Sequence, residues 1–420
     1  MSFQQGLSGL NSTSKNLEII GNNIANSNTF GAKVSRAEFS DVYANALNGA
    51  GVNSIGIGTT LSAVSQQFTQ GNITSTDNPM DLAINGSGFF QVSDGQNPAL
   101  YSRNGQFKVD RQGFIVNNQG LRLVGYPADG SGVIQPGNAS VIQLPSAGIN
   151  PKATAEIKME MNLDSRVATT APAAGPQIDF GDPRTYNNAT SLSVFDDKGQ
   201  DVALTYYFQK AATDTWNVFV TANGVPINGT ALAPLPTTTI NFPSNGGAPT
   251  SPLGPQPFNI PAGVNSAGAQ TLAMNGVMLD IDGATQYGAA FGVTDMTQNG
   301  YAPGQLTTIK IEANGIVMAR YSNGQNKPAA QVELATFRNP QGLQPMGGNA
   351  WARSFVSGDP IIGVAGQGNL GVLQSGALEE SNVDLTAELV SMITAQRTYQ
   401  ANAQTIKTQD QVLQTLVNLR

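Results

Sequence analysis

Apolar residues recur at alternating steps of four and three near both ends of the chain. At the front they follow Phe3, Leu7, Leu10, Ser14, Leu17, Gly21 and Ile24. At the end they follow Leu385, Leu389, Met392, Gln396, Tyr399, Ala403, Ile406, Asp410, Leu413 and Val417. This spacing is typical of a coiled-coil seam, in which apolar side chains pack against a second helix. The two patterns predict helices over 1–27 and 380–420.

The second of these helices can begin after Asp384 or after Asn382, because either side chain can accept the first free backbone N–H groups. No Pro or Gly lies between Leu385 and Leu419, so we expect one unbroken helix about 50 Å long. Either the two helices form a hairpin within one chain, or neighbouring copies cover them. Because isolated helices are marginal in water, we expect the ends to be largely disordered in a free chain and helical after assembly.

The front helix runs into a cluster of asparagines. Asn22, Asn23, Asn26 and Asn28 fall within seven residues, and asparagine favours helix ends and turns because it tolerates left-handed backbone. The following stretch mixes a short amphipathic piece around Phe39 with a Gly-rich run over 50–60. We expect 28–70 to be a flexible connecting segment.

From about residue 71 the apolar period changes to two, which is typical of strands. The runs 82–84 and 89–92 flank a turn at 85–88 and favour a hairpin, and further strands are expected over 101–124. The runs 306–311, 316–321 and 331–337 predict a second set of strands. We interpret 71–147 and 298–379 as two parts of one core β-domain.

The middle of the chain, 148–297, is also rich in strand patterns. The runs 191–195 and 202–208 flank the turn 196–199 and predict a hairpin, and 216–220 alternates as another strand. Nine of the 23 prolines lie between 226 and 261, so a long, exposed, irregular excursion is expected there.

The predicted fold is therefore mainly β with a terminal α-helical coiled coil, nested over several domains. An inner helical domain is made from both chain ends, 1–27 and 380–420. The core β-domain follows, and 148–297 is inserted into it as an outer β-domain.

Composition excludes many functions. The net charge is −7 with no basic cluster, which argues against nucleic-acid binding. Histidine and cysteine are both absent, which removes thiol nucleophiles, disulfides and every histidine-dependent triad or metal site. Chemistry through carboxylates, Tyr or Lys stays open, but most common reaction types are excluded. We expect no catalytic residues, no metal and no cofactor, and we expect that the protein is not an enzyme. A dinucleotide-like G-x-G-x-x-G at 366–371 and a calcium-like run at 280–283 lack their required contexts and predict turns.

The chain also carries no membrane or secretion pattern. No apolar run approaches 18 residues, so we expect no membrane-spanning segment. The first residues lack a basic and then apolar leader, so a cleavable secretory signal is not expected. The protein either stays inside the cell or leaves by another route.

Several longer motifs, in order along the chain, resemble the bacterial flagellar rod and hook proteins. The front signature is carried by Gly21, Asn22, Asn23, Ile24, Ala25, Asn26, Asn28 and Thr29. The end signature begins with Asn382, Val383, Asp384 and Leu385. The runs 77–84, 86–90 and 101–107 are similar to the family's core β-domain. The family usually has an aromatic residue where this chain has Ala32.

Length separates the members of this family. Distal rod subunits resemble both ends but lack most of a block like 148–297, whereas hook subunits carry one. The resemblance therefore favours a hook subunit, with a distal rod subunit as the alternative. Two rivals come from other classes. A secreted protease or hydrolase inserted in a flagellar scaffold is not supported, because nothing in 150–297 supplies a nucleophile with a base. A secreted coiled-coil adhesin is opposed by the paired family signatures and by the lack of a visible secretory signal.

The resemblance implies a homopolymer that forms a curved, flexible tube, joins rod to filament, transmits torque as a universal joint and encloses an export channel. It implies contacts with a distal rod protein, a hook cap protein and a hook–filament junction protein. It also implies export by the flagellar type III apparatus to the extracellular hook. The residues expected to form the polymerisation seam are Phe3, Leu7, Leu10, Leu17, Ile24, Leu385, Leu389, Met392, Tyr399, Ile406, Leu413 and Val417.

Overall fold

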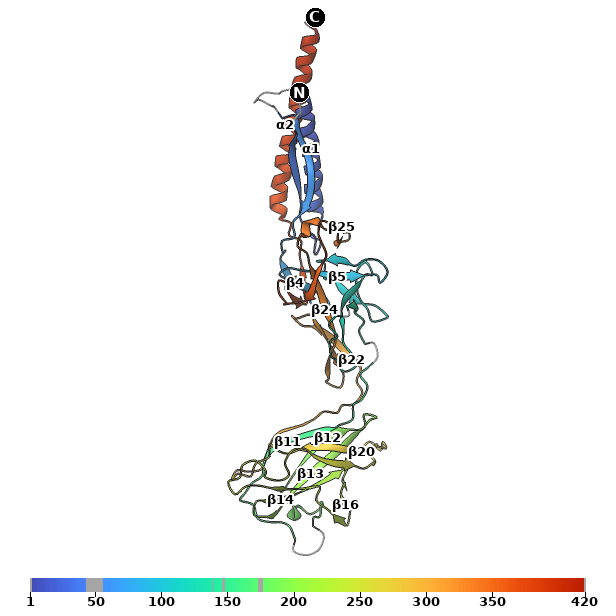
Figure 1. The fold of residues 1–420 in the computed structure, drawn as a ribbon, viewed down its shortest axis with the longest axis vertical. Helices are drawn as coiled ribbons and strands as arrows, with labels where there is room; N and C mark the ends of the chain where they lie inside the picture. The colour runs from blue at the N-terminus through green and yellow to red at the C-terminus, as the bar shows by residue number, and fades with distance from the viewer. Residues whose placement is uncertain (1, 43–55, 138, 146–147, 173–176, 419–420) are drawn as a thin grey trace. The chain divides into compact units, whose positions relative to one another are not determined.

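A computed structural model describes residues 2–42, 56–137, 139–145, 148–172 and 177–418. It is mainly β, with one α-helix at each end of the chain (Figure 1). The chain divides into two compact units. Unit 1 comprises Met1–Ser146, Thr308–Arg320 and Asn326–Arg420, and unit 2 comprises Ala147–Thr307 and Tyr321–Gln325. The predicted fold class is confirmed, whereas the predicted domain boundaries, with the helices as a domain of their own, stay a prediction.

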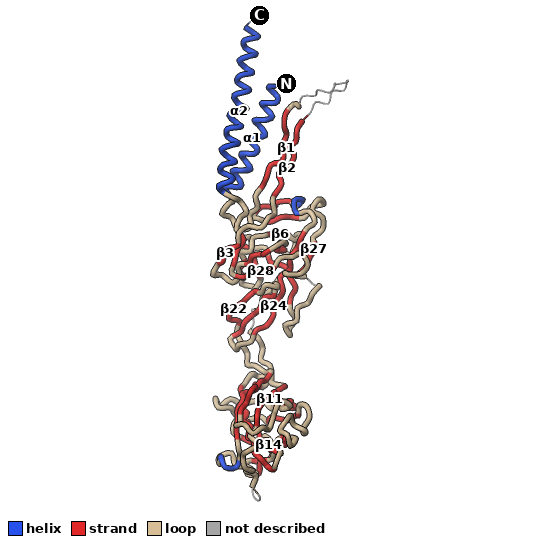
Figure 2. Tube along the Cα trace, turned by 90° about the vertical axis from the view of Figure 1, so that its left-hand side faces the viewer, coloured by secondary structure: helices blue, strands red, loops and turns tan. Residues whose placement is uncertain are grey.

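The two terminal helices lie side by side in unit 1 (Figures 1 and 2). Helix α1 spans Ser2–Ala25 and ends in the turn at the predicted asparagines. Helix α2 spans Leu385–Asn418 without a break. Its cap is Asp384, whose carboxylate accepts the N–H groups of Thr386 at 2.9 Å and Ala387 at 3.1 Å. The structure thus shows the hairpin within one chain; whether the helices persist in a free chain in solution stays a prediction.

Two strands of unit 1 lie in the segment expected to be a flexible connection. Strand β1 (Ser35–Val42) pairs antiparallel with β2 (Gly58–Gln66), and residues 43–55 fall outside the described residues. The hairpin lies along α1, where the Ser12 and Thr59 hydroxyls are 2.9 Å apart. The sequence pattern did not predict these strands because they are largely polar and little buried. The pattern rules detect burial on one face, which is nearly absent here.

The large sheet of unit 1 joins strands from both halves of the chain. Its order is β22 (Leu306–Ile311), β23 (Ile316–Tyr321), β24 (Asn326–Thr336), β9 (Arg122–Pro127), β5 (Phe89–Ser93), β6 (Leu100–Ser102), β26 (Ala350–Ala352) and β25 (Gln344–Gly347). Strands β7 (Phe107–Val109), β8 (Ile115–Asn117), β10 (Ser140–Val141) and β27 (Ile361–Val364) attach beside this path. The short helix η2 (Pro340–Gly342) follows β24. The strands expected over 306–337 are confirmed.

The predicted hairpin between 82–84 and 89–92 is wrong in its pairing. Both segments are strands, β4 (Leu82–Asn85) and β5, but β4 pairs with β28 (Val372–Ser375). Likewise β3 (Ile73–Ser75) pairs with β29 (Ala377–Glu379). The connection at 85–88 bends through Gly86 and Gly88 at φ of 116° and 126°. With these angles the chain passes from one sheet to another. A two-residue hairpin turn would instead have paired β5 with β4.

Unit 2 packs two sheets around its own core. One contains β12 (Asn188–Phe195), β13 (Asp201–Ala212), β14 (Thr215–Ala222), β15 (Val225–Pro226) and β18 (Thr238–Asn241). The other contains β19 (Gln256–Ile260), β20 (Met274–Asp280), β11 (Glu156–Asn162) and β21 (Gly292–Gln298). The small pair β16 (Gly229–Thr230) and β17 (Ala233–Pro234) and the short helix η1 (Pro183–Thr185) lie outside these sheets. Fully buried Tyr206, Phe208 and Trp216 fill the core.

The hairpin predicted at 191–208 is confirmed, with Phe195 opposite Asp201. The excursion predicted over 226–261 is wrong in part. Strands β18 and β19 lie within it and complete the two sheets, so Ile240, Phe258 and Ile260 are buried. The prolines are compatible with these strands because they lie at strand ends and edges.

Candidate functional site: the terminal helices and their junction with the core sheet

Within the chain, α1 contacts α2 largely through small and polar residues, together with Ile406 of the predicted seam. A Cβ atom added to Gly6 would lie 3.0 Å from Ile406, and one added to Gly9 would lie 2.8 Å from Asn402. A cavity of about 410 Å³ continues this contact. It is lined by Gly9, Ser12, Thr13, Asn16, Phe39, Thr59, Thr394, Ala395, Thr398 and Asn402. On α1 the contact with α2 follows positions 6, 9, 13 and 16. Each of these lies one residue before a position of the predicted seam.

The predicted seam residues lie mostly on the outside of the helix pair. Phe3, Leu7, Leu385, Leu389, Tyr399, Leu413 and Val417 are between 38% and 75% exposed. Leu10, Leu17, Ile24, Met392 and Ile406 are half-buried. The seam prediction missed Val390 and Ile393, which are also more than half exposed. They lie one position beyond Leu389 and Met392 and widen the apolar face. The role of this face in polymerisation stays a prediction.

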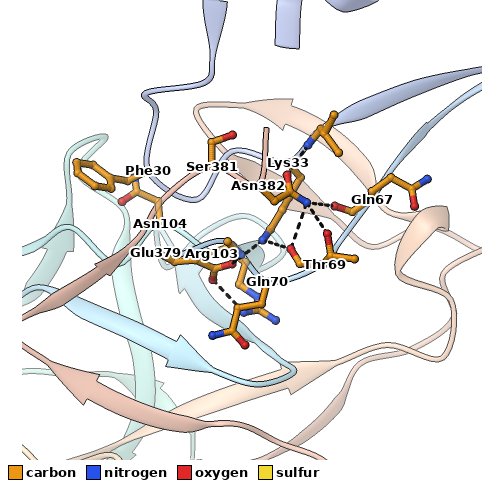
Figure 3. Close-up of polar contacts among 12 residues, drawn as sticks. Phe30, Lys33, Gln67, Thr69, Gln70, Arg103, Asn104, Glu379, Ser381 and Asn382 are labelled. Atoms are coloured by element: carbon orange, nitrogen blue, oxygen red, sulfur yellow. Dashed lines mark hydrogen bonds and ion pairs between the residues drawn. The ribbon is translucent and has the colours of Figure 1, made fainter. Parts of the chain in front are cut away.

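Where the helices meet the sheet, a buried ion cluster joins distant parts of unit 1 (Figure 3). The Lys33 ammonium lies 2.6 Å from Glu379 Oε1, and Arg103 Nη1 lies 3.0 Å from Glu379 Oε2. The Gly71 N–H also donates to Glu379 Oε1, at 3.0 Å. Lys33 follows α1, Arg103 follows β6, and Glu379 ends β29. One carboxylate therefore links the loop after α1, the core sheet and the approach to α2.

The electrostatics of this cluster are unbalanced, because two cations share one anion. Burial lowers the pKa of Lys33, and the adjacent Glu379 carboxylate opposes that shift. Burial lowers the pKa of Arg103 as well, again against Glu379. Further contacts ease the excess charge. Lys33 donates to the Thr69 carbonyl at 2.7 Å, and Arg103 donates to the Gly86 carbonyl at 2.9 Å.

The loop after α1 depends on glycine. Gly31 has a φ of 71°, and its N–H donates to the Glu379 carbonyl at 2.9 Å. A Cβ atom there would lie 2.6 Å from the Asn104 backbone nitrogen, so no larger residue fits. Ala32, where the resembling family usually has an aromatic residue, is buried against this junction.

Two signature asparagines make hydrogen bonds where α1 ends and α2 begins. Asn23 on α1 donates to the Ser35 carbonyl at 2.8 Å and to Glu388 of α2 at 3.1 Å. Asn382 accepts the Val34 N–H at 2.8 Å and donates to the Gln67 carbonyl at 2.8 Å. Asn382 was one of two predicted caps for α2; it instead fixes the β1–β2 hairpin, and Asp384 forms the cap.

The other signature residues surround these two. At the end of α1, the Asn26 side-chain amide donates to the Asn22 carbonyl at 2.9 Å. The Thr29 N–H donates to the Asn26 carbonyl at 3.1 Å. A polar cavity of about 290 Å³ adjoins this turn and is lined in part by Asn22, Asn23, Asn26 and Val383. Gly21, Ile24 and Ala25 lie on the last turns of α1, and Asn28 in the turn after it.

Sequence reasoning missed Lys33, Arg103 and Glu379 as a group. They lie up to 346 residues apart in the chain, and no spacing rule joins them. One signal was available: only 12% of residues are charged, and Lys33 and Arg103 each have uncharged neighbours on both sides.

Within the described parts of the chain, no helix is long and apolar enough to cross a membrane. The described residues also hold no group of three acidic residues placed to bind a metal ion. The motif at 366–371 is a turn, as predicted, in which the Gly366 N–H donates to the Gly371 carbonyl.

Comparison with known proteins agrees with this arrangement. The family model "Flagella basal body rod protein" matches residues 3–33, and "Flagellar basal body rod FlgEFG protein C-terminal" matches 374–419. "Flagellar hook protein FlgE/F/G D1 domain" matches 83–162, and "Flagellar basal body protein FlaE D2 domain" matches 162–301. The matched ends are α1 and α2 with their junctions.

The relatives extend over the whole chain. The flagellar hook protein FlgE of Escherichia coli (strain K12) is 41% identical over 425 residues, covering 100% of both chains. That of Brucella suis biovar 1 is 33% identical, covering 100% of this chain and 98% of its own. The chain belongs to the flagellar hook protein family. The resemblance seen in the sequence is confirmed, and this hook protein is a structural subunit of the flagellum; the rod and adhesin alternatives are not favoured.

A solved structure supports the fold. The crystal structure of Helicobacter pylori flagellar hook protein FlgE2 superposes with a TM-score of 0.54 at 15% identity. It covers 73% of this chain and 100% of that chain.

Proposed function

We propose that this hook protein polymerises through the outward apolar face of its terminal helices into a curved, flexible tube that joins rod to filament. One observation carries the proposal: Leu385, Leu389, Val390 and Ile393 line α2 while each is at least 45% exposed. Burying a side chain of this size contributes about 1.5–3 kcal/mol. A row of four such residues in water is therefore costly unless a neighbour covers it.

The intrachain contact does not use this apolar surface. Because Gly6, Gly9 and Asn402 occupy the face between the helices, the larger apolar side chains remain available to other copies. A contact between two different surfaces of identical chains does not close on itself when rotation is combined with a rise, and it then builds a helical tube. Exposed positions of the helices away from this apolar face are polar, and they would suit a water-filled export channel.

The rigid junction gives this tube a way to carry torque. Glu379 bridges Lys33 and Arg103 within a buried cluster, so the helices and the core sheet of unit 1 would move together. Bending of the tube would then fall to contacts between copies. Low-charge outer surfaces form hydrogen bonds of about 1 kcal/mol each, weak enough to break and form again as the hook rotates.

The same proposal covers partners, export and location. The chain would contact a distal rod protein, a hook cap protein and a hook–filament junction protein. It would be exported unfolded by the flagellar type III apparatus to the extracellular hook. A catalytic role is not proposed; the absence of His and Cys supports that position.

Genetic replacement tests the proposal. Cells from which this gene is deleted should lack hooks and swimming, and the intact gene should restore both. Electron microscopy should show curved tubes at the cell surface, and antibody against the chain should label those tubes along their length. Label confined to the rod, or normal hooks in the deleted cells, would overturn the proposal.

A further inference from the structure

A second apolar surface of unit 1 is fully in water. Phe355 is 103% exposed and Val356 is 67% exposed, in a turn over 353–358 that follows β26. We call 353–358 the Phe355 turn. Single exposed apolar residues are common on protein surfaces. A phenylalanine with no protein cover at all, next to an exposed valine, is a different case because aromatic residues dominate the energetics of protein interfaces.

The Phe355 turn is held rigidly. The Ser354 hydroxyl donates to the Gly342 carbonyl at 2.5 Å and accepts the Val356 N–H at 3.1 Å. The Ser357 hydroxyl accepts the Ser354 N–H at 2.9 Å, and Ser357 is 1% exposed. A side chain presented by a fixed turn loses little conformational entropy when a partner covers it.

The surface that fits this turn lies on α2. Leu385, Leu389 and Ile393 follow one another at steps of four, so they form one row along the helix. Each is between 45% and 51% exposed. Since the Phe355 turn and this row are both exposed in the same chain, they do not cover each other within it.

Charge favours the same pairing. Arg353 lies in the Phe355 turn and pairs with Asp359, so the excess positive charge beside the turn comes from exposed Arg338. Arg338 precedes Asn339, whose amide donates to the Val356 carbonyl at 3.3 Å. The base of α2 carries Glu380, Asp384 and Glu388. Opposite charges around two apolar surfaces steer their encounter and fix their register.

We propose that the Phe355 turn of one copy docks on the Leu385, Leu389 and Ile393 row of α2 in a neighbouring copy. The inference rests on the proposed function and names one contact by which the copies join. The two surfaces differ, so each chain can use both at once, and the contact repeats from copy to copy without closing.

Disulfide trapping tests this contact cleanly because the chain has no cysteine. Cells would express a Phe355→Cys chain together with a Leu389→Cys chain, each diluted with the unsubstituted chain. Hooks purified from them would be oxidised and digested, and mass spectrometry would search for peptides that join positions 355 and 389. Because the two cysteines lie on different chains, any such peptide reports a contact between copies.

The expected result is a 355–389 disulfide in assembled hooks, at least tenfold more abundant than in chains dissociated before oxidation. The matched control pairs Phe355→Cys with Gln404→Cys, an exposed position farther along α2, and should give at least tenfold less product. Hooks that contain both cysteine chains but yield no 355–389 peptide would overturn the inference and leave the proposed function intact. Absence of hooks from cells with the unsubstituted chain would overturn both.

A second measurement does not depend on cysteine. Hooks made from a Phe355→Ala chain should dissociate at a lower temperature than unsubstituted hooks, while the melting temperature of the free chain is unchanged. Val133→Ala, at another exposed apolar residue of unit 1 (58% exposed), should leave both temperatures unchanged. Equal hook stability for the Phe355→Ala and unsubstituted chains would count against the docking contact.

Discussion

The core sheet of unit 1 and the terminal helix pair use apolar residues in opposite directions. In the sheet, Phe90, Leu123 and Leu334 are fully buried within one cluster. In the helix pair, Leu385 and Leu389 point outward and the internal contact is made by Gly6 and Gly9. Both regions have the apolar periodicity expected of their elements. The apolar side chains of the sheet are thus covered within one chain, whereas the helix pair leaves an apolar surface exposed, which we propose a neighbour covers.

Leu389→Asp should have the largest effect, and it should affect assembly through the helix pair while the core sheet stays folded. A charge on the outward face of α2 would have to be buried on assembly without a partner, which is strongly unfavourable. We expect loss of hooks in complemented cells, by electron microscopy. The β cores should be untouched, so near-ultraviolet circular dichroism from buried Trp216 and Trp351 should match that of the unsubstituted chain.

Gln404→Asp is the matched control, since it places the same charge on an exposed polar position of α2. It should assemble normally. If Leu389→Asp also gave hooks of normal length and number, the outward apolar face would not be the polymerisation surface. If it lost the near-ultraviolet signal, the two regions would not be independent.

The next largest effect is expected at the junction, from Glu379→Ala. Removing this carboxylate leaves Lys33 and Arg103 buried without their common anion. Breaking a buried ion pair by removing one partner costs about 3–5 kcal/mol. Urea unfolding followed by tryptophan fluorescence should show that loss in unit 1.

Glu380→Ala removes the neighbouring carboxylate, which makes no ion pair among the described residues, and should change the free energy of unfolding by less than about 0.5 kcal/mol. If Glu379→Ala also changed the free energy of unfolding by less than about 0.5 kcal/mol, the junction would tolerate two buried cations without their shared anion.

The sequence was a good guide wherever one face of an element is buried within the same chain. The alternation over 202–208 and the apolar run over 316–321 correspond to β13 and β23. Asp384 was one of two predicted caps, and it forms the cap. The ends were found by their heptad spacing, although the spacing alone did not say which face of each helix meets its partner in the chain.

Other features depend on contacts between distant residues, and no local pattern reports those. Strands β1 and β2 are polar and were missed. β4 was found as a strand but was assigned the wrong partner, since β28 lies almost 290 positions farther along. The Lys33, Arg103 and Glu379 cluster was missed for the same reason, because the three charges are far apart in the sequence and only the fold brings them together.

A smaller effect, of opposite sign, is expected from Glu333→Gln within the core sheet. Glu333 is 0% exposed, and neither carboxylate oxygen makes a regular hydrogen bond among the described residues. Burial raises the pKa of Glu333, and the nearby Tyr126 hydroxyl offsets this in part. Gln91, whose side-chain oxygen also lacks a partner in the described residues, lies one position beyond the Leu334–Phe90 pair.

The sign follows from proton linkage. A carboxyl whose pKa is raised by folding binds more protons in the folded chain. Its contribution is therefore fully present below its ordinary pKa of 4.5 and is lost as the pH rises through the raised value. Glu333→Gln should increase the free energy of unfolding by about 1–2 kcal/mol at pH 7 and change it little at pH 4. Urea titrations at both pH values check this; an equal gain at both would mean that proton uptake by Glu333 is not the cause.

The smallest effect, and the finest test of the helix pair, is expected from Asp384→Ala. Loss of the cap leaves the Thr386 and Ala387 N–H groups without their acceptor and costs about 1 kcal/mol, whereas Asp384→Asn keeps an acceptor and should cost much less. The cost appears only where α2 is helical. If the helix exists in the free chain, far-ultraviolet circular dichroism should show a lower helix signal for Asp384→Ala than for Asp384→Asn. If it forms only on assembly, the free chains should give equal signals and only the Asp384→Ala hooks should dissociate at a lower temperature. Comparison of the two variants thus distinguishes a helix pair that forms before assembly from one that forms only when neighbouring copies cover it.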